Sequence, residues 1–155
     1  MSEATVRPRL LFVEDDRDNL ETFSMILDQR YAVFGYPSAI DAVRAIDVVR
    51  PDLLLLDIGM RPVDGLECLK AIRAIPGYAE IPALALTGYA RAVERQSFLD
   101  GGFQAVVVKP VVDHLELIAM IDELLIRGSH LDVRRIVPTS SAPRSTEGSN
   151  GGAPA

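Results

Sequence analysis

Several features are scarce in this 155-residue chain, and each scarcity excludes a class of protein. The single cysteine, Cys68, rules out an intramolecular disulfide and is typical of a reducing compartment. No apolar run is long enough to span a membrane, and residues 1–9 contain no apolar signal-peptide core. Only 16 basic residues stand against 22 acidic ones, and this net charge of -6 argues against broad binding to nucleic acids or anionic membranes. We therefore expect a cytoplasmic protein.

Short apolar runs alternate with segments that have helical spacing or helix-capping residues. Hydrophobic residues make up 48% of the chain and charged residues 25%, which suits one globular domain with a real core. The expected strands are Leu10–Val13, Tyr31–Tyr36, Leu53–Asp57, Ala83–Leu86 and Ala105–Val108, and the expected helices cover about 16–29, 38–50, 66–75, 91–100 and 113–127. This alternation predicts an α/β fold with a doubly wound, five-stranded parallel sheet and five helices.

The two ends of the chain differ from this pattern. Residues 1–8 form a short polar lead, and the predicted domain covers 9–127. From about Gly128 the chain is dominated by Ser, Thr, Pro, Gly and Ala, with little apolar content to bury. We predict that 128–155 is a disordered tail.

Polar residues of useful kinds follow four of the expected strands: Glu14 and Asp15, then Asp57, Thr87 and Lys109. The carboxyl ends of parallel strands lie at one edge of a sheet, where ligands bind. Clustered carboxylates repel one another unless a hard cation lies among them, and magnesium suits such oxygen ligands. An aspartate can also attack phosphorus, with a lysine and a hydroxyl stabilising the transferred group. The set has the parts that phosphoryl transfer to Asp57 requires.

The chain resembles the receiver domain of two-component response regulators, the CheY-like family. The matching segments are Phe12–Asp16, Leu55–Met60, Asp64-Gly65, Ala85–Gly88 and Val108–Pro110, and they span roughly residues 8–127. Each segment alone is weak, but all five in this order and spacing are specific. The resemblance implies a flavodoxin-like strand order of 2-1-3-4-5.

The resemblance also implies a function. Asp57 would accept phosphate from a histidine kinase or a histidine phosphotransfer protein, in a reaction that needs Mg²⁺. Asp15 and Asp57 would bind the metal through carboxylates, Glu14 mainly through water, and Gly59 through its backbone carbonyl. The protein would be a phosphoacceptor with slow self-dephosphorylation rather than an enzyme. No second folded domain is visible, so we expect a single-domain regulator that signals by altered protein–protein binding to a downstream protein.

Two further residues acquire roles from the resemblance. Thr87 would move to hydrogen-bond the phosphate, and Lys109 would pair with it. The Lys109–Pro110 bond is expected to be cis, on the family's pattern alone.

Four positions depart from the family pattern or tune it. Where the family has an aromatic side chain three residues before the lysine, this chain has Val106, so a rotating aromatic switch is not expected. Arg61 occupies the place of a usual proline and is a candidate for recognition of the phosphate donor. Gly59 and Tyr89, two residues beyond the phosphoacceptor and the threonine, stand where relatives tune dephosphorylation.

Other interpretations stay open at this point. A strand-end aspartate by itself is most often a turn or cap residue, so the assignment of Asp57 depends on the whole set. A phosphatase using an aspartyl phosphate would carry a second aspartate where Gly59 stands. A phosphorylation-independent interaction module and a receiver excised from a hybrid histidine kinase are the remaining alternatives.

The last expected helix carries apolar residues on opposite sides. Leu117, Ile121 and Leu124 lie on one broad face, whereas Leu115 and Ile126 lie nearly opposite. The outer residues are either scattered exposed side chains or part of a surface for a partner or dimer. The resemblance places that surface on the last two helices and the last strand.

Overall fold

The computed structural model describes residues 6–60, 63–88, 91–109, 111 and 113–136, and only the backbone of the final helix after Arg127. The chain divides after Leu125 into two compact units, Met1–Leu125 and Ile126–Ala155. The sheet and its surroundings belong to the first unit. In the described part of the chain, no helix combines the length and the apolar character needed to cross a membrane.

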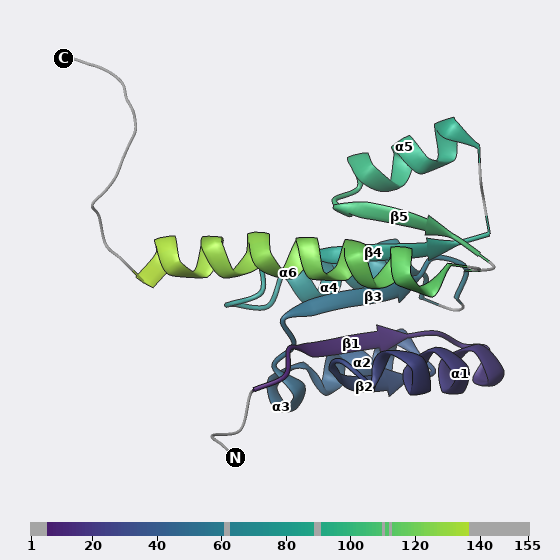
Figure 1. Cartoon of the computed structure of the whole chain (residues 1–155). Coiled ribbons are helices and arrows are strands. Elements are labelled where there is room, and N and C mark those ends of the chain that lie inside the picture. The colour runs from purple at the N-terminus through teal and green to yellow at the C-terminus, as the bar shows by residue number, and fades with distance from the viewer. Residues whose placement is uncertain (1–5, 61–62, 89–90, 110, 112, 137–155) are drawn as a thin grey trace. The chain divides into compact units, whose positions relative to one another are not determined.

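A five-stranded parallel sheet in the order β2-β1-β3-β4-β5 forms the centre of the first unit (Figure 1). The strands are β1 (Arg9–Val13), β2 (Ala32–Tyr36), β3 (Leu53–Asp57), β4 (Ala83–Thr87) and β5 (Ala105–Val108). The predicted fold class and strand order are confirmed. The order reverses between β1 and β3, and ligands bind at such a switch point in open α/β sheets.

Helices cover both faces of this sheet, and their bounds are α1 (Arg17–Leu27), α2 (Ala39–Arg44), α3 (Ile46–Val49), α4 (Gly65–Arg73), α5 (Ala92–Asp100) and α6 (His114–Ile136). One core packs α1 and α6 against Phe12 and Leu55. The other packs α2 to α5 against Leu11 and Leu54. Neighbouring residues of one strand therefore face different cores, as the strand period of two requires.

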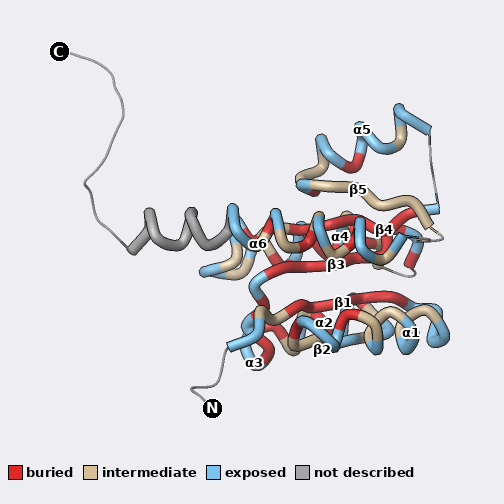
Figure 2. The backbone as a smooth tube through the Cα atoms, in the orientation of Figure 1, coloured by how far each residue is buried: buried red, intermediate tan, exposed pale blue. Residues whose placement is uncertain are grey.

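Burial is deepest in the middle strands. Every residue of β3 and β4 is buried, whereas the four residues of the edge strand β5 are only half-buried (Figure 2). Continuous apolar runs are typical of parallel strands covered on both faces, which explains the four leucines of β3.

Side-chain caps fix where several helices begin. The carboxylate of Asp16 accepts from the amide of Asn19, and the hydroxyl of Ser38 accepts from Asp41. The Asp113 carboxylate accepts from the amide of Glu116 in the same way at the start of α6. The complete capping box, with Asp64 and Glu67, precedes α4 and was not anticipated.

Two helix predictions were wrong in their extent. The single helix expected over 38–50 is divided at Ala45 into α2 and α3, and α3 ends at Val49, before Arg50, whose φ of 52° is left-handed. The last helix was expected to end near Arg127–Gly128, but α6 continues to Ile136. A single glycine costs a helix only about 1 kcal/mol, so Gly128 need not end it. The predicted disorder of 137–155 lies outside the described residues.

Candidate functional site

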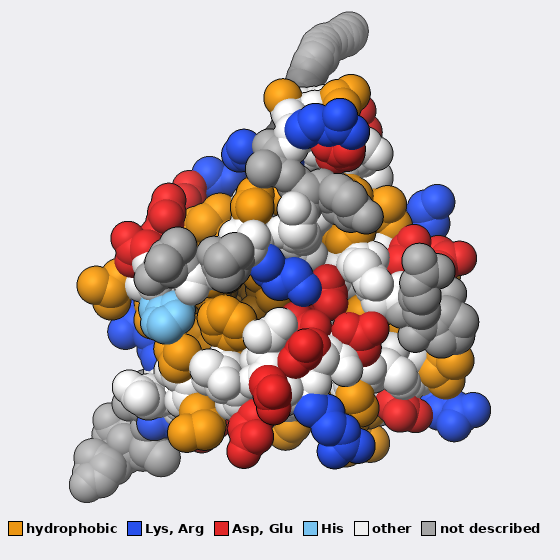
Figure 3. Space-filling model, turned by 90° about the vertical axis from the view of Figure 1, so that its right-hand side faces the viewer, with side chains coloured by type: hydrophobic (Ala, Val, Ile, Leu, Met, Phe, Trp, Pro, Cys, Tyr) orange, Lys and Arg blue, Asp and Glu red, His pale blue; other side chains and the backbone are white. Residues whose placement is uncertain are grey.

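The polar strand ends meet at the carboxyl edge of the sheet. Val13 is level with Leu56 in the register of β1 and β3, so Glu14 and Asp57 follow side by side. On the other side of β3, Thr87 is level with Val108, directly before Lys109. Figure 3, which looks onto this edge, shows acidic side chains gathered beside a basic one.

Three carboxylates form the centre of the site. One oxygen each from Glu14, Asp15 and Asp57 lies within 4.8 Å of the others. Glu14 and Asp57 are buried, whereas Asp15 is exposed at the mouth of the site. The edge thus concentrates negative charge, with two of the three carboxylates withdrawn from solvent.

Lys109 is the cation that faces these acids. Its Nζ lies 3.3 Å from Asp57 Oδ1 and 3.5 Å from Glu14 Oε1. Burial lowers the pKa of Lys109, but the negative charges of Asp57 and Glu14 outweigh it and leave the pKa raised. The ammonium therefore stays charged at the site.

One amine does not satisfy three acids. Burial, with Asp57 nearby, raises the pKa of Glu14 from 4.5 to about 7. Glu14 Oε2 accepts from the amide of Asp16 at 3.1 Å, but the buried Oε1 has no hydrogen-bond partner among the described residues. Excess buried carboxylate with an oxygen that accepts no hydrogen bond fits a hard divalent cation, and magnesium accepts a few carboxylates while keeping water ligands.

The turn after β3 orients the central carboxylate. Asp57 Oδ1 accepts from the amide of Gly59 at 3.0 Å as well as from Lys109. At Gly65, the first residue of α4, a Cβ atom would lie 2.7 Å from the carbonyl oxygen of Asp57. Glycine is therefore required for α4 to begin against the end of β3. The sequence identified Asp64-Gly65 as part of the family pattern but not this steric reason for the glycine.

The other predicted positions fall in different places. Thr87 is buried at the end of β4, and its carbonyl accepts from the amide of Lys109 at 2.7 Å. Val106 is half-buried in β5 and packs against the core on the α5 side. Arg61, Tyr89 and Pro110 lie outside the described residues, so the predictions for Arg61, Tyr89 and the Lys109–Pro110 bond are not tested.

Residues given no site role on sequence grounds have structural roles. Asp16 caps α1, and His114 makes an edge contact with the ring of Phe23, 5.9 Å between centroids. Cys68 is buried in the core, and this burial raises the pKa of its thiol to about 11. Because the thiolate is the reactive form, Cys68 is no nucleophile at neutral pH.

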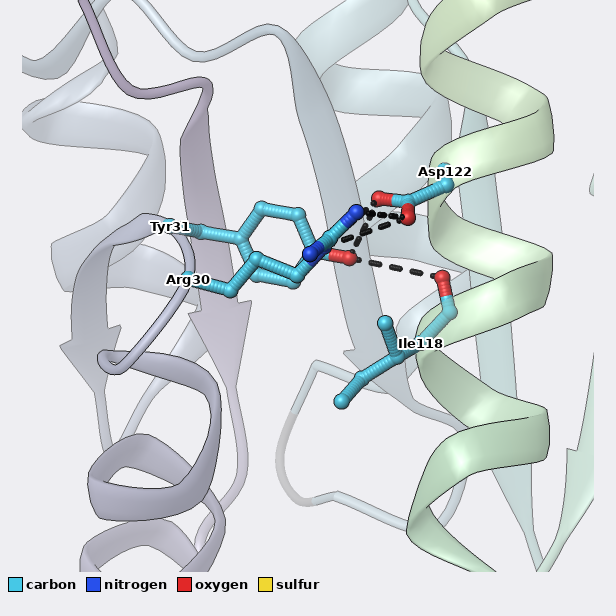
Figure 4. Close-up of polar contacts among 4 residues, drawn as sticks. All are labelled: Arg30, Tyr31, Ile118 and Asp122. Carbon is cyan, nitrogen blue, oxygen red and sulfur yellow. Dashed lines mark hydrogen bonds and ion pairs between the residues drawn. The ribbon is translucent and has the colours of Figure 1, made fainter. Parts of the chain in front are cut away.

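A second polar cluster lies at the opposite end of the strands and holds α6 (Figure 4). The hydroxyl of Tyr31 donates to Asp122 Oδ1 at 2.6 Å, and Arg30 Nη2 lies 2.6 Å from Asp122 Oδ2. The Tyr31 hydroxyl also lies 3.3 Å from the carbonyl oxygen of Ile118. We call Arg30, Tyr31 and Asp122 the α6 clasp; it joins the start of β2 to the middle of α6.

A parallel 2-1-3-4-5 sheet with an acid cluster and a lysine at its carboxyl edge defines the CheY-like class of signalling domain. The chain belongs to the response regulator receiver domain family, whose model matches residues 10–122. The cluster of Glu14, Asp15 and Asp57 fits the magnesium site of a receiver.

Individual relatives agree with this assignment. The chain is 36% identical over 115 residues to an uncharacterised 14.6 kDa protein of Leptolyngbya boryana, covering 74% of this chain and 87% of that protein. It is 33% identical over 130 residues to the transcriptional regulatory protein PrrA of Mycobacterium tuberculosis, covering 82% of this chain and 54% of PrrA. The chain thus spans about half the length of that regulator.

A solved structure with the same fold is the receiver domain of the sensor histidine kinase PA1611 of Pseudomonas aeruginosa. It superposes with a TM-score of 0.69 at 27% identity, covering 78% of this chain and 98% of that domain. That structure was determined with a magnesium ion coordinated in its active-site cleft.

Proposed function

We propose that Asp57 accepts a phosphoryl group from a histidine kinase or a histidine phosphotransfer protein, with Mg²⁺ held by Glu14, Asp15 and Asp57. The observation that carries the proposal is the convergence of these acids with Lys109 at one edge of the sheet. The phosphorylated chain then changes its affinity for a protein partner, which makes it a signalling phosphoacceptor.

The chain's own residues account for the transfer. A carboxylate oxygen of Asp57 attacks phosphorus, the bond from phosphorus to the donor's imidazole nitrogen breaks, and an acyl phosphate forms. Asp57 is ready for this because Lys109 and the amide of Gly59 hold its carboxylate in one orientation. Lys109 then pairs with the incoming phosphoryl oxygens, and the Thr87 hydroxyl donates to them. A bound magnesium ion neutralises charge on the acids and on the transferred group.

Intact mass spectrometry after incubation with acetyl phosphate and Mg²⁺ tests this proposal. Wild type is expected to gain one phosphate, and Asp57→Asn is expected to gain none. Asp18→Asn, which removes an exposed acid of α1, is the matched control and should behave like wild type. Chelation of the metal should abolish the gain. No added mass on wild type would favour a phosphorylation-independent module instead.

The same experiment separates the proposal from a phosphatase. An aspartyl-phosphate phosphatase would release inorganic phosphate from small phosphoesters over many turnovers, whereas a receiver holds one phosphate. Gly59 stands where such an enzyme would carry its second acid, and it is exposed beside Asp57. We expect no turnover of small phosphoesters.

The partner surface that we propose is the face formed by α5, β5 and α6. A groove of about 350 Å³ lies there, lined among others by Arg95, Val106, Glu116 and Leu117. Leu115 of α6 is 77% exposed and Val93 of α5 is 72% exposed, so both helices also present apolar side chains to solvent. A phosphorylation-dependent dimer through this face is one way in which the chain could change its protein binding.

Sedimentation of the chain with and without phosphate on Asp57 tests for this dimer. Leu115→Glu should weaken any association.

A further inference from the structure

Helix α5 is attached to the domain mainly near one end. Among its residues only Phe98, in the second half, is buried, and the N-cap residue Arg91 makes no side-chain cap bond. Val93 in the first turn is 72% exposed, whereas Leu99 near the end is 39% exposed. The first turn of α5 therefore has little apolar contact to hold it in place.

The other end of α5 is tied by polar contacts to α4. Gly102, just after the helix, has a φ of 116°, and its carbonyl accepts from Arg73 Nη1 at 2.7 Å. Arg73 Nη2 donates to the carbonyl of Ile81 at 2.8 Å and lies 3.2 Å from Gln104 Oε1. Gln104 Oε1 also accepts from the amide of Ala83 at 2.8 Å. One guanidinium thus joins the end of α4, the approach to β4 and the turn between α5 and β5.

The chemistry of Arg73 indicates a positioning role. It forms no ion pair with a carboxylate in the described part of the chain, its buried Nε has no hydrogen-bond partner there, and burial lowers its pKa. A half-buried cation without an anion is costly unless its hydrogen bonds are specific. The planar guanidinium fixes the directions of its bonds, which a lysine ammonium cannot do. The arrangement holds three segments in one geometry.

The loosely held first turn of α5 is the end of the helix that comes soon after Thr87 in the chain. The chain leaves β4 at Thr87, whose hydroxyl is expected to respond to phosphate. Val106, which stands below α5 in β5, is β-branched and stiff about χ1, so it offers no rotating side chain as a relay. The backbone that runs from Thr87 into α5 is a route that needs no rotating side chain.

We propose that α5 swings as a rigid lever about a pivot at Gly101–Gly102, and that Arg73 is the residue that fixes this pivot. The proposal rests on the proposed phosphorylation of Asp57. A helix rises 1.5 Å per residue, so Val93 lies about 13 Å and Leu99 about 4 Å from Gly102 along the axis. Rotation about that point moves position 93 roughly three times as far as position 99, whereas sliding moves both equally.

Distance measurements between spin labels on the full chain test this ratio. One protein carries Met25→Cys on α1 with Val93→Cys, and the other carries Met25→Cys with Leu99→Cys. All three native side chains are exposed, so labels fit. The buried thiol of Cys68, with its pKa of about 11, stays unlabelled at pH 7, which the mass of the labelled wild type checks. Each pair is measured before and after acetyl phosphate with Mg²⁺, and intact mass records the phosphate.

The expected result is a shift at position 93 about three times that at position 99. Arg73→Lys, which keeps the charge but loses the planar guanidinium, should bring the ratio toward one and broaden the distances at position 99. If that variant does not fold, Gln104→Ala replaces it. Gln104 is exposed, and its substitution removes one of the hydrogen bonds made by the Arg73 guanidinium.

Equal shifts in phosphorylated wild type, or an unchanged ratio in the variant, would overturn the pivot while leaving phosphorylation intact. Absence of added phosphate on wild type would overturn the proposed function and the pivot with it. The two failures are therefore distinguished by the mass measurement.

Discussion

Lys109 Nζ lies 3.3 Å from Asp57 Oδ1 although the two residues are 52 positions apart in the chain. The contact exists because β4 separates β3 from β5 by a single strand, and because both side chains emerge at the carboxyl ends of their strands. A buried acid and its amine are thus supplied by non-neighbouring strands of one rigid sheet.

Removing the amine should destabilise the metal-free protein. Lys109→Met leaves the buried carboxylates of Glu14 and Asp57 without a cation, at a cost of about 1–3 kcal/mol in the free energy of unfolding. Urea denaturation followed by circular dichroism measures this. Lys70→Met, which replaces the other lysine of the chain at an exposed position of α4, is the control and should change little. Equal effects of the two substitutions would contradict a pairing role for Lys109.

Magnesium should stabilise the folded chain. A ligand that binds only the native state adds about 2.7 kcal/mol at a hundred times its dissociation constant. Glu14→Gln removes one acid of the cluster and should weaken this stabilisation severalfold. Glu21→Gln, at an exposed position of α1, should leave the magnesium effect unchanged. Thermal unfolding over a magnesium titration gives both numbers, and a melting temperature insensitive to the ion would refute the metal site.

Gly65→Ala should displace the phosphoacceptor Asp57 through its backbone. The added Cβ would meet the carbonyl oxygen of Asp57 at 2.7 Å, so either α4 or the end of β3 has to shift. Overpacking of this kind costs about 1–3 kcal/mol, and we expect at least a tenfold slower phosphorylation by acetyl phosphate. Gly88→Ala is the matched control because no atom of the described residues lies within 4 Å of its Cβ position. Wild-type phosphorylation rates in Gly65→Ala would show that the contact is not needed.

The α6 clasp predicts a loss of stability at alkaline pH. Burial, with the nearby Asp122 carboxylate, raises the pKa of Tyr31 above its ordinary 10.0. The folded state then holds the hydroxyl proton more tightly than the unfolded state, so this stabilisation is complete below pH 10 and is lost as pH rises further. Tyr31→Phe should cost about 1 kcal/mol at pH 7 by removing the hydrogen bond to Asp122.

The comparison of wild type with Tyr31→Phe isolates this titration. The difference in unfolding free energy should be constant between pH 6 and 9 and should shrink at pH 11. Tyr78→Phe, which loses a 3.3 Å hydrogen bond to the carbonyl of Ile46, serves as a control because the partner in that bond is a carbonyl and not a carboxylate. A difference that stays constant to pH 11 would contradict the assigned role of the Tyr31 proton.

The sequence by itself determined the sheet and the composition of the site. Short apolar runs such as Leu53–Leu56 are typical of strands covered on both faces, and each predicted strand is present within a residue or two of its expected bounds. Asp57, Glu14, Asp15, Thr87 and Lys109 were identified because each follows such a run, and parallel strands end at one edge. Local pattern and chain order were sufficient for these inferences.

Only the tertiary structure decided what depends on long-range contact. No local pattern in the chain predicts three of the contacts described above. These are the 3.5 Å approach of Lys109 to Glu14, the packing of Gly65 against the carbonyl of Asp57, and the hydrogen bonds of the Arg73 guanidinium to neighbouring segments. The division at Ala45 and the continuation of α6 to Ile136 were also missed. Helix ends are set by a balance of about 1 kcal/mol per residue, which packing and capping readily tip. Sequence periodicity resolves where apolar surface must go, whereas distances between side chains arise only once the sheet is assembled.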